Sequence, residues 1–191
     1  MFFAKGKRGK VYKLFFLAIK VKRKDSEALG NIEREGEWLK LLNEHEIGPK
    51  IYFYGKNFLV YKFVIGETIL EYFKHASKKE KLRVVEEVFM QCRVLDKLKI
   101  NKFEMNHQFK HILIGKKVVM IDFERCSYSE KPKNVTQFAQ SLDKLSIETN
   151  KSKMKKALKR YKESYSEGDY EKILGLIISL LTFFIISFLN L

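Results

Sequence analysis

Cysteine and proline are scarce in this chain, with two of each among 191 residues. Cys92 and Cys126 are too few for a disulfide framework and lack the spacing of a metal site, so we expect reduced thiols in a cytosolic protein. Pro49 and Pro132 are the only prolines, and no internal repeat is visible. These absences exclude a disulfide-stabilised scaffold and a repeat architecture.

Two segments near the C-terminus lack charged residues: one has no acidic residue, and the other has no charged residue of either sign. Residues 151–162 contain no acidic residue, and residues 173–191 contain no charged residue. A helix of nineteen residues is about 28 Å long, close to the thickness of the bilayer core. We therefore expect a basic linker over 151–172 and a transmembrane tail anchor over 173–191, at the cytoplasmic face of the cell membrane beside anionic lipids. The alternative is a terminal helix buried against the domain of a soluble cytoplasmic protein.

The rest of the composition is that of a basic globular protein. Hydrophobic residues make up 46% of the chain and aromatic residues 14%, which is enough for a packed core. The formal net charge is +15 at pH 7. A surface with this excess attracts phosphates, anionic lipids or nucleic acids.

The order of strand and helix patterns predicts an α+β fold. Residues 4–24 predict two or three short strands, and residues 25–46 predict a helix that ends before the turn at Gly48-Pro49. Further segments complete the layout: strands at 51–54 and 58–63, helical patterning over 67–100, a loop at 101–110, strands at 111–114 and 118–121, and a helix at 135–145. A β-rich half with one helix thus precedes a mostly helical half.

Three short strings in a fixed order predict a nucleotide site. Gly6 and Gly9 lie among lysine and arginine residues, and glycine lets backbone N–H groups approach phosphate oxygens closely. Lys20 follows Ala18 in a predicted strand, from which its ammonium can reach inward to phosphates. Asp122 ends the apolar strand at 118–121, where a carboxylate can hold a metal ion. The ordinary alternatives are a basic tail, an edge-strand lysine and a helix N-cap aspartate.

One acidic residue lies on the apolar stripe of the predicted helix at 25–46. Ile32, Leu39 and Leu42 share a helix face, and Glu35 falls on the same face. A carboxylate is costly to bury unless it is paired. Lys20 is the natural partner, so we expect a Lys20–Glu35 ion pair.

Segments 110–114, 121–126 and 133–138 together resemble the predicted archaeal serine/threonine protein kinases, a small group related to the RIO kinases. The resemblance covers roughly residues 4–145. It implies a minimal bilobal protein-kinase fold in a domain over 1–150, with an N-lobe over about 1–62 and a C-lobe over about 65–150. It also implies ATP with Mg²⁺ or Mn²⁺ as cofactors, and a protein or small molecule as the phosphate acceptor.

The resemblance further implies which residues bind ATP. They comprise the glycine segment, the strand lysine with its partner, and a hinge whose backbone would bond the adenine edge: Gly6, Gly9, Val11, Ala18, Lys20, Glu35, Phe63 and Val64.

The catalytic loop departs from the family pattern, in which an aspartate base stands five residues before a metal-binding asparagine. Here His111 stands at the asparagine position, as a second candidate metal ligand with Asp122, and Asn106 stands at the base position. Glu104 would be the base if the loop carries a two-residue insertion. Without an insertion the base is missing. Lys110 would neutralise developing phosphate charge.

Four functions follow from these observations. The leading one is an ATP-dependent atypical serine/threonine protein kinase, and Glu124 in place of the usual glycine after Phe123 favours a small-molecule kinase of the choline or aminoglycoside type. The missing catalytic aspartate favours a nucleotide-binding pseudokinase or membrane scaffold. The net charge of +15 favours an RNA- or ribosome-associated module, although the chain has no RNP-like aromatic motif or zinc knuckle.

Overall fold

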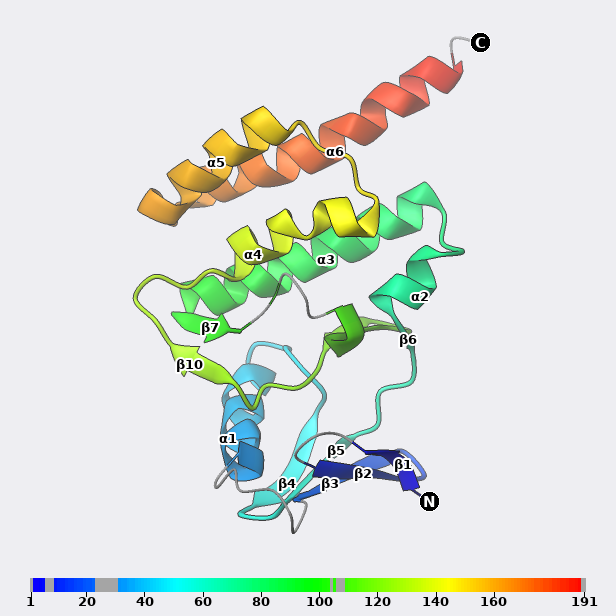
Figure 1. Ribbon diagram of the computed structural model, residues 1–191, viewed down its shortest axis with the longest axis vertical. Helices are drawn as coiled ribbons and strands as arrows, with labels where there is room; N and C mark the ends of the chain where they lie inside the picture. Colours follow the sequence, from blue (N-terminus) through cyan, green and yellow to red (C-terminus); the bar gives the residue numbers. More distant parts are fainter. Residues whose placement is uncertain (1, 6–8, 23–30, 104, 106–108, 190–191) are drawn as a thin grey trace. The chain divides into compact units, whose positions relative to one another are not determined.

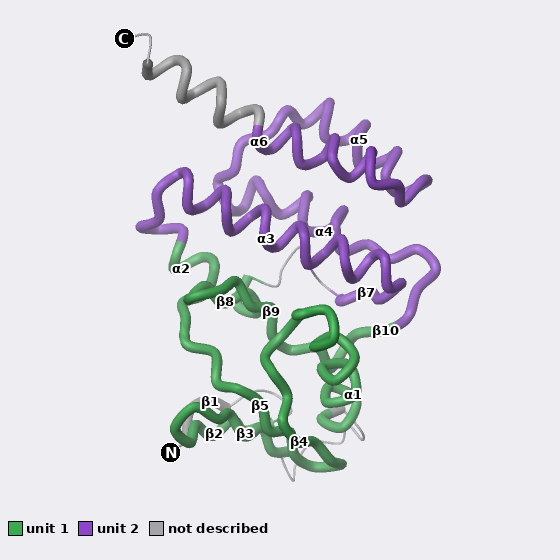
Figure 2. Tube along the Cα trace, turned by 180° about the vertical axis from the view of Figure 1, so that it is seen from behind, with its two compact units in different colours: residues 1–72, 109–127 green, residues 73–108, 128–191 purple. Residues whose placement is uncertain are grey.

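The computed structural model describes residues 2–5, 9–22, 31–103, 105 and 109–189, with only the backbone described at 2–5, 31 and 179–189. These residues form an α+β structure, so the fold class expected from the sequence is confirmed (Figure 1). The chain divides into two compact units (Figure 2). Unit 1 contains Met1–Tyr72 and Phe109–Ser127, and unit 2 contains Phe73–Gln108 and Tyr128–Leu191.

Unit 1 contains two antiparallel sheets. The larger sheet has the strand order β1-β2-β3-β5-β4, and the smaller one the order β6-β8-β9. The elements that lie wholly in this unit are β1 (Phe2–Lys5), β2 (Gly9–Leu14), β3 (Leu17–Lys22), α1 (Asn31–Asn43), β4 (Ile51–Gly55), β5 (Phe58–Lys62), β6 (Glu67–Thr68), the 3₁₀ turn η1 (Phe109–His111), β8 (Ile112–Ile114) and β9 (Val118–Met120). The chain passes between the units within α2 (Ile69–Phe73), between Gln108 and Phe109, and within β10 (Cys126–Tyr128). Strands β8 and β9, which precede Asp122, belong to unit 1, and β8 pairs there with β6. The N-lobe expected from the sequence ended near residue 62.

Helix α1 ends in a turn that Asn43 organises. Its side-chain amide donates to Ile47 O at 3.0 Å and Pro49 O at 3.1 Å, and its Oδ1 accepts from Ile51 N at 2.8 Å. Gly48 in this turn has φ +81°, a conformation that favours glycine. The helix end predicted before Gly48-Pro49 is confirmed, and so are the following strands β4 and β5.

Unit 2 is mostly helical. Its elements are α3 (Lys78–Lys97), β7 (Ile100–Lys102), α4 (Asn134–Gln140), the 3₁₀ turn η2 (Leu142–Leu145), α5 (Lys151–Ser164) and α6 (Glu167–Leu189). The helical stretch expected at 67–100 is broken because Ser77 and Glu80 form a capping box that starts α3. The rings of Phe89 and Phe138 pack α3 against α4, edge to face, with centroids 4.9 Å apart.

A buried polar network joins α3 to α4 and α5. The Asp96 carboxylate accepts hydrogen bonds from the backbone N–H groups of Asn134 (3.0 Å) and Val135 (3.3 Å), at the start of α4. The Tyr161 hydroxyl on α5 donates to Asp96 Oδ2 at 2.9 Å and accepts from Arg93 Nη1 at 3.0 Å. Burial raises the pKa of the Asp96 carboxyl, and the hydrogen bonds from Asn134 and Tyr161 oppose that rise. Helix α5 is therefore part of the core of unit 2.

This packing corrects the linker expected at 151–172. Most of that segment is helical, because α5 begins after the Asn150 cap and α6 begins at Glu167. Met154, Ala157 and Tyr161 are buried on one face of α5, at spacings of three and four residues. The segment is a packed helix followed by the start of a second one.

The start of the expected tail anchor is also packed inside unit 2. Ile173 and Ile177 on α6 are buried, with exposed fractions of 0% and 1%. Within the part of the chain that the structure describes, no helix combines the length and the apolar character needed to cross a membrane. The side chains of residues 179–191 lie outside that part.

Candidate nucleotide and metal site

Four predicted ATP-binding residues are neighbours on the hairpin of β2 and β3. Ala18 and Lys20 share one face of β3, because they are two residues apart in a strand. Val11 on β2 lies opposite Lys20. A Cβ at Gly9 would lie 3.3 Å from Lys20 Cγ and 3.2 Å from Val21 O, so glycine leaves room for the lysine stem.

Glu35 on α1 forms an ion pair with Lys20, with 2.5 Å between Oε2 and Nζ. The carboxylate lies on the buried face of α1 beside Ile32 and Leu39, and the residue is only 4% exposed. Glu37 on the same helix faces solvent. The contact predicted from the apolar stripe is confirmed, and its role in binding a nucleotide stays a prediction.

Asp122 follows β9 in an unusual backbone conformation, with φ 64°. This left-handed region is sparsely used by residues with a Cβ, and such residues cluster at functional sites. Ile121 N donates to His111 O at 2.8 Å, and the Phe123 side chain is fully buried. The residues before and after Asp122 are therefore both fixed in position. Oδ1 of Asp122 lies 3.6 Å from Lys20 Nζ, and Oδ2 lies 3.4 Å from His111 Nε2.

Three carboxylates surround the Lys20 ammonium. Glu35, Asp122 and Glu124 each offer an oxygen within 4.8 Å of the other two, and Glu124 Oε2 lies 3.8 Å from Lys20 Nζ. With all three ionised, the four groups carry a net charge of −2. The Asp122 side chain is 31% exposed and that of Glu35 only 5%, so solvent reaches the cluster from the Asp122 side.

The charges of this cluster shift the pKa values of its members. Burial alone would lower the pKa of Lys20, but the carboxylates of Glu35, Asp122 and Glu124 outweigh burial and raise that pKa. Burial raises the pKa of Glu35, and the other two carboxylates act in the same direction against the lowering effect of Lys20. An isolated ion pair would instead lower the pKa of its carboxyl. Lys20 therefore stays cationic, and negative charge is in excess around it.

Other predicted site residues make no ion pair or hydrogen bond with this cluster or are outside the described residues. Gly6, Glu104 and Asn106 are outside them. Lys110 is exposed on η1.

The expected hinge follows β5, and its first two amides are already bonded. Lys62 N donates to Lys50 O at 2.7 Å, and Phe63 N donates to Phe16 O at 2.8 Å. These two N–H groups are not available to an adenine. Val64 has no hydrogen bond to another described residue, so its N–H and C=O groups can still bond a ligand.

Two residues of unit 1 join the site without having been assigned to it from the sequence. Tyr61 on β5 lies opposite Ala18, and burial raises its pKa to about 12, with the charge of Glu35 acting in the same direction. Arg34 on α1 donates from Nη2 to Cys126 O at 2.9 Å, which ties the helix of Glu35 to the segment after Asp122. The strand register is what places Tyr61 at the site, because Tyr61 pairs with Ala18, and Ala18 lies two residues before Lys20 on β3.

Both cysteines are free, as their number and spacing predicted, and both are buried. No protein-family model matches the chain, and no curated protein matches it either.

Proposed function

We propose that this protein is an ATP-dependent phosphotransferase, an atypical serine/threonine protein kinase with a minimal kinase fold. The observation that carries the proposal is the Lys20–Glu35 ion pair beside Asp122. A strand lysine, its helix carboxylate and an aspartate at a strand end are the parts that a kinase uses to hold ATP. They lie within one compact unit here.

The proposed roles follow from the charges. Lys20 would contact the phosphates, and Glu35 would keep its ammonium in place, because that contact is the shortest and most buried of the cluster. Asp122 and Glu124 would hold Mg²⁺ or Mn²⁺, which prefer carboxylate oxygens. The carboxylates of Asp122 and Glu124 beside Lys20 offer negative charge that fits a divalent cation. When bound, the ion would neutralise phosphate charge.

Six further residues have roles in the proposal. Val11 and Ala18 lie on the same sheet face as Lys20, where they would border the adenine. The backbone of Val64 would bond the adenine edge. The acceptor hydroxyl would be oriented by Glu104, with Asn106 as the alternative base, and Lys110 would neutralise developing charge. Serine or threonine as the acceptor rests on the family resemblance.

Glu124 supports a second candidate, a small-molecule kinase. Its carboxylate lies 3.8 Å from Lys20 Nζ, where protein kinases of the usual pattern have a glycine. Phosphorylation of a small alcohol with no phosphorylation of protein would favour this candidate.

The test is metal-dependent binding and turnover of ATP by the full chain. We expect ATP to bind with Mg²⁺ present, and Asp122→Ala to weaken that binding by at least about tenfold, as for other losses around a metal site. Asp143→Ala is the matched control, because Asp143 is an exposed aspartate whose partner is Lys151. ATP affinity that is independent of Mg²⁺, or unchanged in Asp122→Ala, would remove the kinase site from this position. Binding without turnover would make the protein a pseudokinase.

A further inference from the structure

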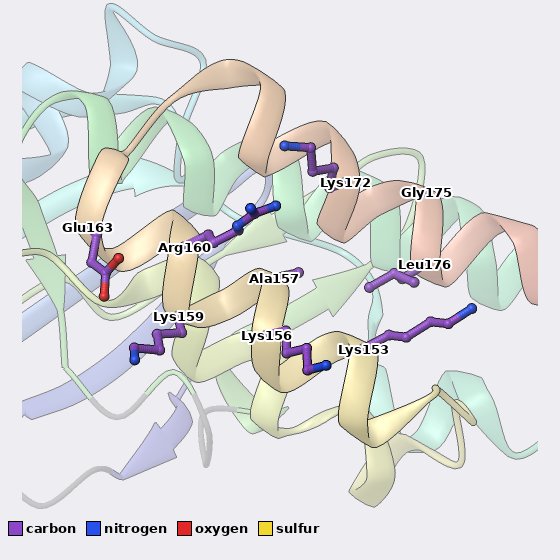
Figure 3. Close-up of a pocket in the computed structure, with 9 residues that line it drawn as sticks. All are labelled: Lys153, Lys156, Ala157, Lys159, Arg160, Glu163, Lys172, Gly175 and Leu176. Carbon is purple, nitrogen blue, oxygen red and sulfur yellow. The ribbon is translucent and has the colours of Figure 1, made fainter.

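A cationic groove lies in unit 2, between α5 and α6. The groove is open, has a volume of about 740 Å³, and is lined by Lys153, Lys156, Ala157, Lys159, Arg160, Glu163, Lys172, Gly175 and Leu176. Figure 3 shows side chains from both helices around this space. Five of the nine are cations, and one is an acid.

The sequence of α5 concentrates charge on this side of the helix. Met154, Ala157 and Tyr161 use one face for the core of unit 2. Lys153, Lys156 and Arg160 follow at spacings of three and four residues along the adjoining face, and all three are exposed. Among the described residues no ion pair neutralises them, whereas Lys172 across the groove is paired with Asp169 at 2.9 Å. The groove therefore presents uncompensated positive charge.

We propose that this groove binds the headgroups of anionic lipids and attaches the protein to the surface of a membrane. Charge complementarity supports an anionic ligand, since each basic residue near an anionic membrane strengthens its attraction. The uncharged segment 173–191 supports a membrane as the source of the ligand, because Gly175 and Leu176 near its start line the groove. The burial of Ile173 and Ile177 in unit 2 favours attachment to the surface over a span that begins at residue 173.

The groove lacks what single-stranded nucleic acid would need. Aromatic side chains stack on bases in such sites. Among the residues whose side chains the structure describes, the apolar part of the groove lining is Ala157, Gly175 and Leu176, none of them aromatic. Apart from its chain neighbours and the nearby backbone of α6, no described atom lies within 4 Å of a Cβ built on Gly175.

The experiment is co-sedimentation of the full chain with vesicles, either of phosphatidylcholine alone or with about a third phosphatidylserine. We expect binding only to the anionic vesicles, weakening as salt is raised. Lys156→Gln with Arg160→Gln removes two groove charges and should lower binding about 25-fold, because each basic residue contributes about fivefold. Glu163→Gln removes the acid of the groove and should strengthen binding.

The control is Lys155→Gln with Lys162→Gln, which removes two exposed charges from the same helix outside the groove lining. Its effect should be several times smaller. Equal losses in the two double variants would show that overall charge acts and the groove does not, which overturns the proposal. Equal binding to neutral vesicles would overturn the proposal and indicate that the uncharged segment 173–191 attaches the protein to the membrane. Binding of an RNA oligonucleotide with the same ranking of variants, and no binding of vesicles, would make the groove a nucleic-acid surface.

Discussion

At the scale of residues, the site depends on a half-buried lysine that lies among acids. Lys20 has one close partner, Glu35 at 2.5 Å, and two carboxylates at 3.6 and 3.8 Å. Taking such groups out of water costs free energy, which the attraction between them offsets only while both signs are present. The ion pair is therefore better understood as a device that fixes the position of the ammonium than as a source of stability.

This interpretation predicts strong coupling between Lys20 and Glu35 in stability. Lys20→Met leaves three carboxylates crowded together, and Glu35→Gln removes the most buried one. We expect Lys20→Met to lower the free energy of unfolding by about 3–5 kcal/mol, the usual cost of breaking a buried pair. The double variant should cost much less than the sum of the two single variants. Chemical denaturation of all four proteins gives the coupling energy.

The matched control for this cycle is Glu37→Gln, since Glu37 lies on the same helix and faces solvent. It should change the free energy of unfolding by less than about 0.5 kcal/mol. If the losses from Lys20→Met and Glu35→Gln simply add, the two residues do not act as a pair.

At the scale of elements, Glu35 reaches Lys20 because α1 packs closely on the sheet. Gly36, the next residue, is buried, and a Cβ there would overlap Cβ, Cγ and Cδ2 of Tyr54 on β4. Glycine in a helix interior costs about 0.5–1 kcal/mol relative to alanine. Glycine is needed here because α1 approaches β4 too closely for a Cβ at this position.

Gly36→Ala should therefore destabilise the protein although alanine is the better helix former. Overpacking of this kind costs about 1–3 kcal/mol, which exceeds the gain in helix propensity. Gly175→Ala on α6 is the control, because a Cβ built there meets no described atom outside the nearby backbone of α6, and it should stabilise by up to about 1 kcal/mol. Thermal unfolding of the two variants should show shifts of opposite sign. A stabilised Gly36→Ala protein would contradict the close packing of α1.

Local patterns in the sequence were enough for several elements and for part of the site. The stripe of Ile32, Glu35 and Leu39 predicted both α1 and the Lys20–Glu35 contact, because helix periodicity fixes which residues share a face. The buried face of α5 was missed since its apolar residues are outnumbered by lysines, although Met154, Ala157 and Tyr161 have helical spacing. Glu124 was not assigned to the cluster because its approach to Lys20 depends on the backbone turn at Asp122, which periodicity does not report.

At the scale of the whole molecule, the net charge of +15 opposes folding. Like charges repel more strongly in the compact state than in the unfolded chain. The excess is concentrated in α5, where residues 151–164 hold seven basic residues and one acid. Like charges one helical turn apart, such as Lys155 and Lys159, each destabilise a helix by a few tenths of a kcal/mol.

Salt should therefore stabilise this protein instead of weakening it. The Debye length falls from about 30 Å at 0.01 M salt to about 8 Å at 0.15 M, which screens repulsion between exposed lysines more than the buried contacts of Lys20. We expect the unfolding temperature to rise by several degrees over this range, measured at fixed pH with sodium chloride. Lys155→Gln with Lys162→Gln should raise the unfolding temperature at low salt and reduce its dependence on salt. A chain whose unfolding temperature falls as sodium chloride is added would instead owe its stability to exposed ion pairs, such as Lys99–Glu130 and Lys151–Asp143.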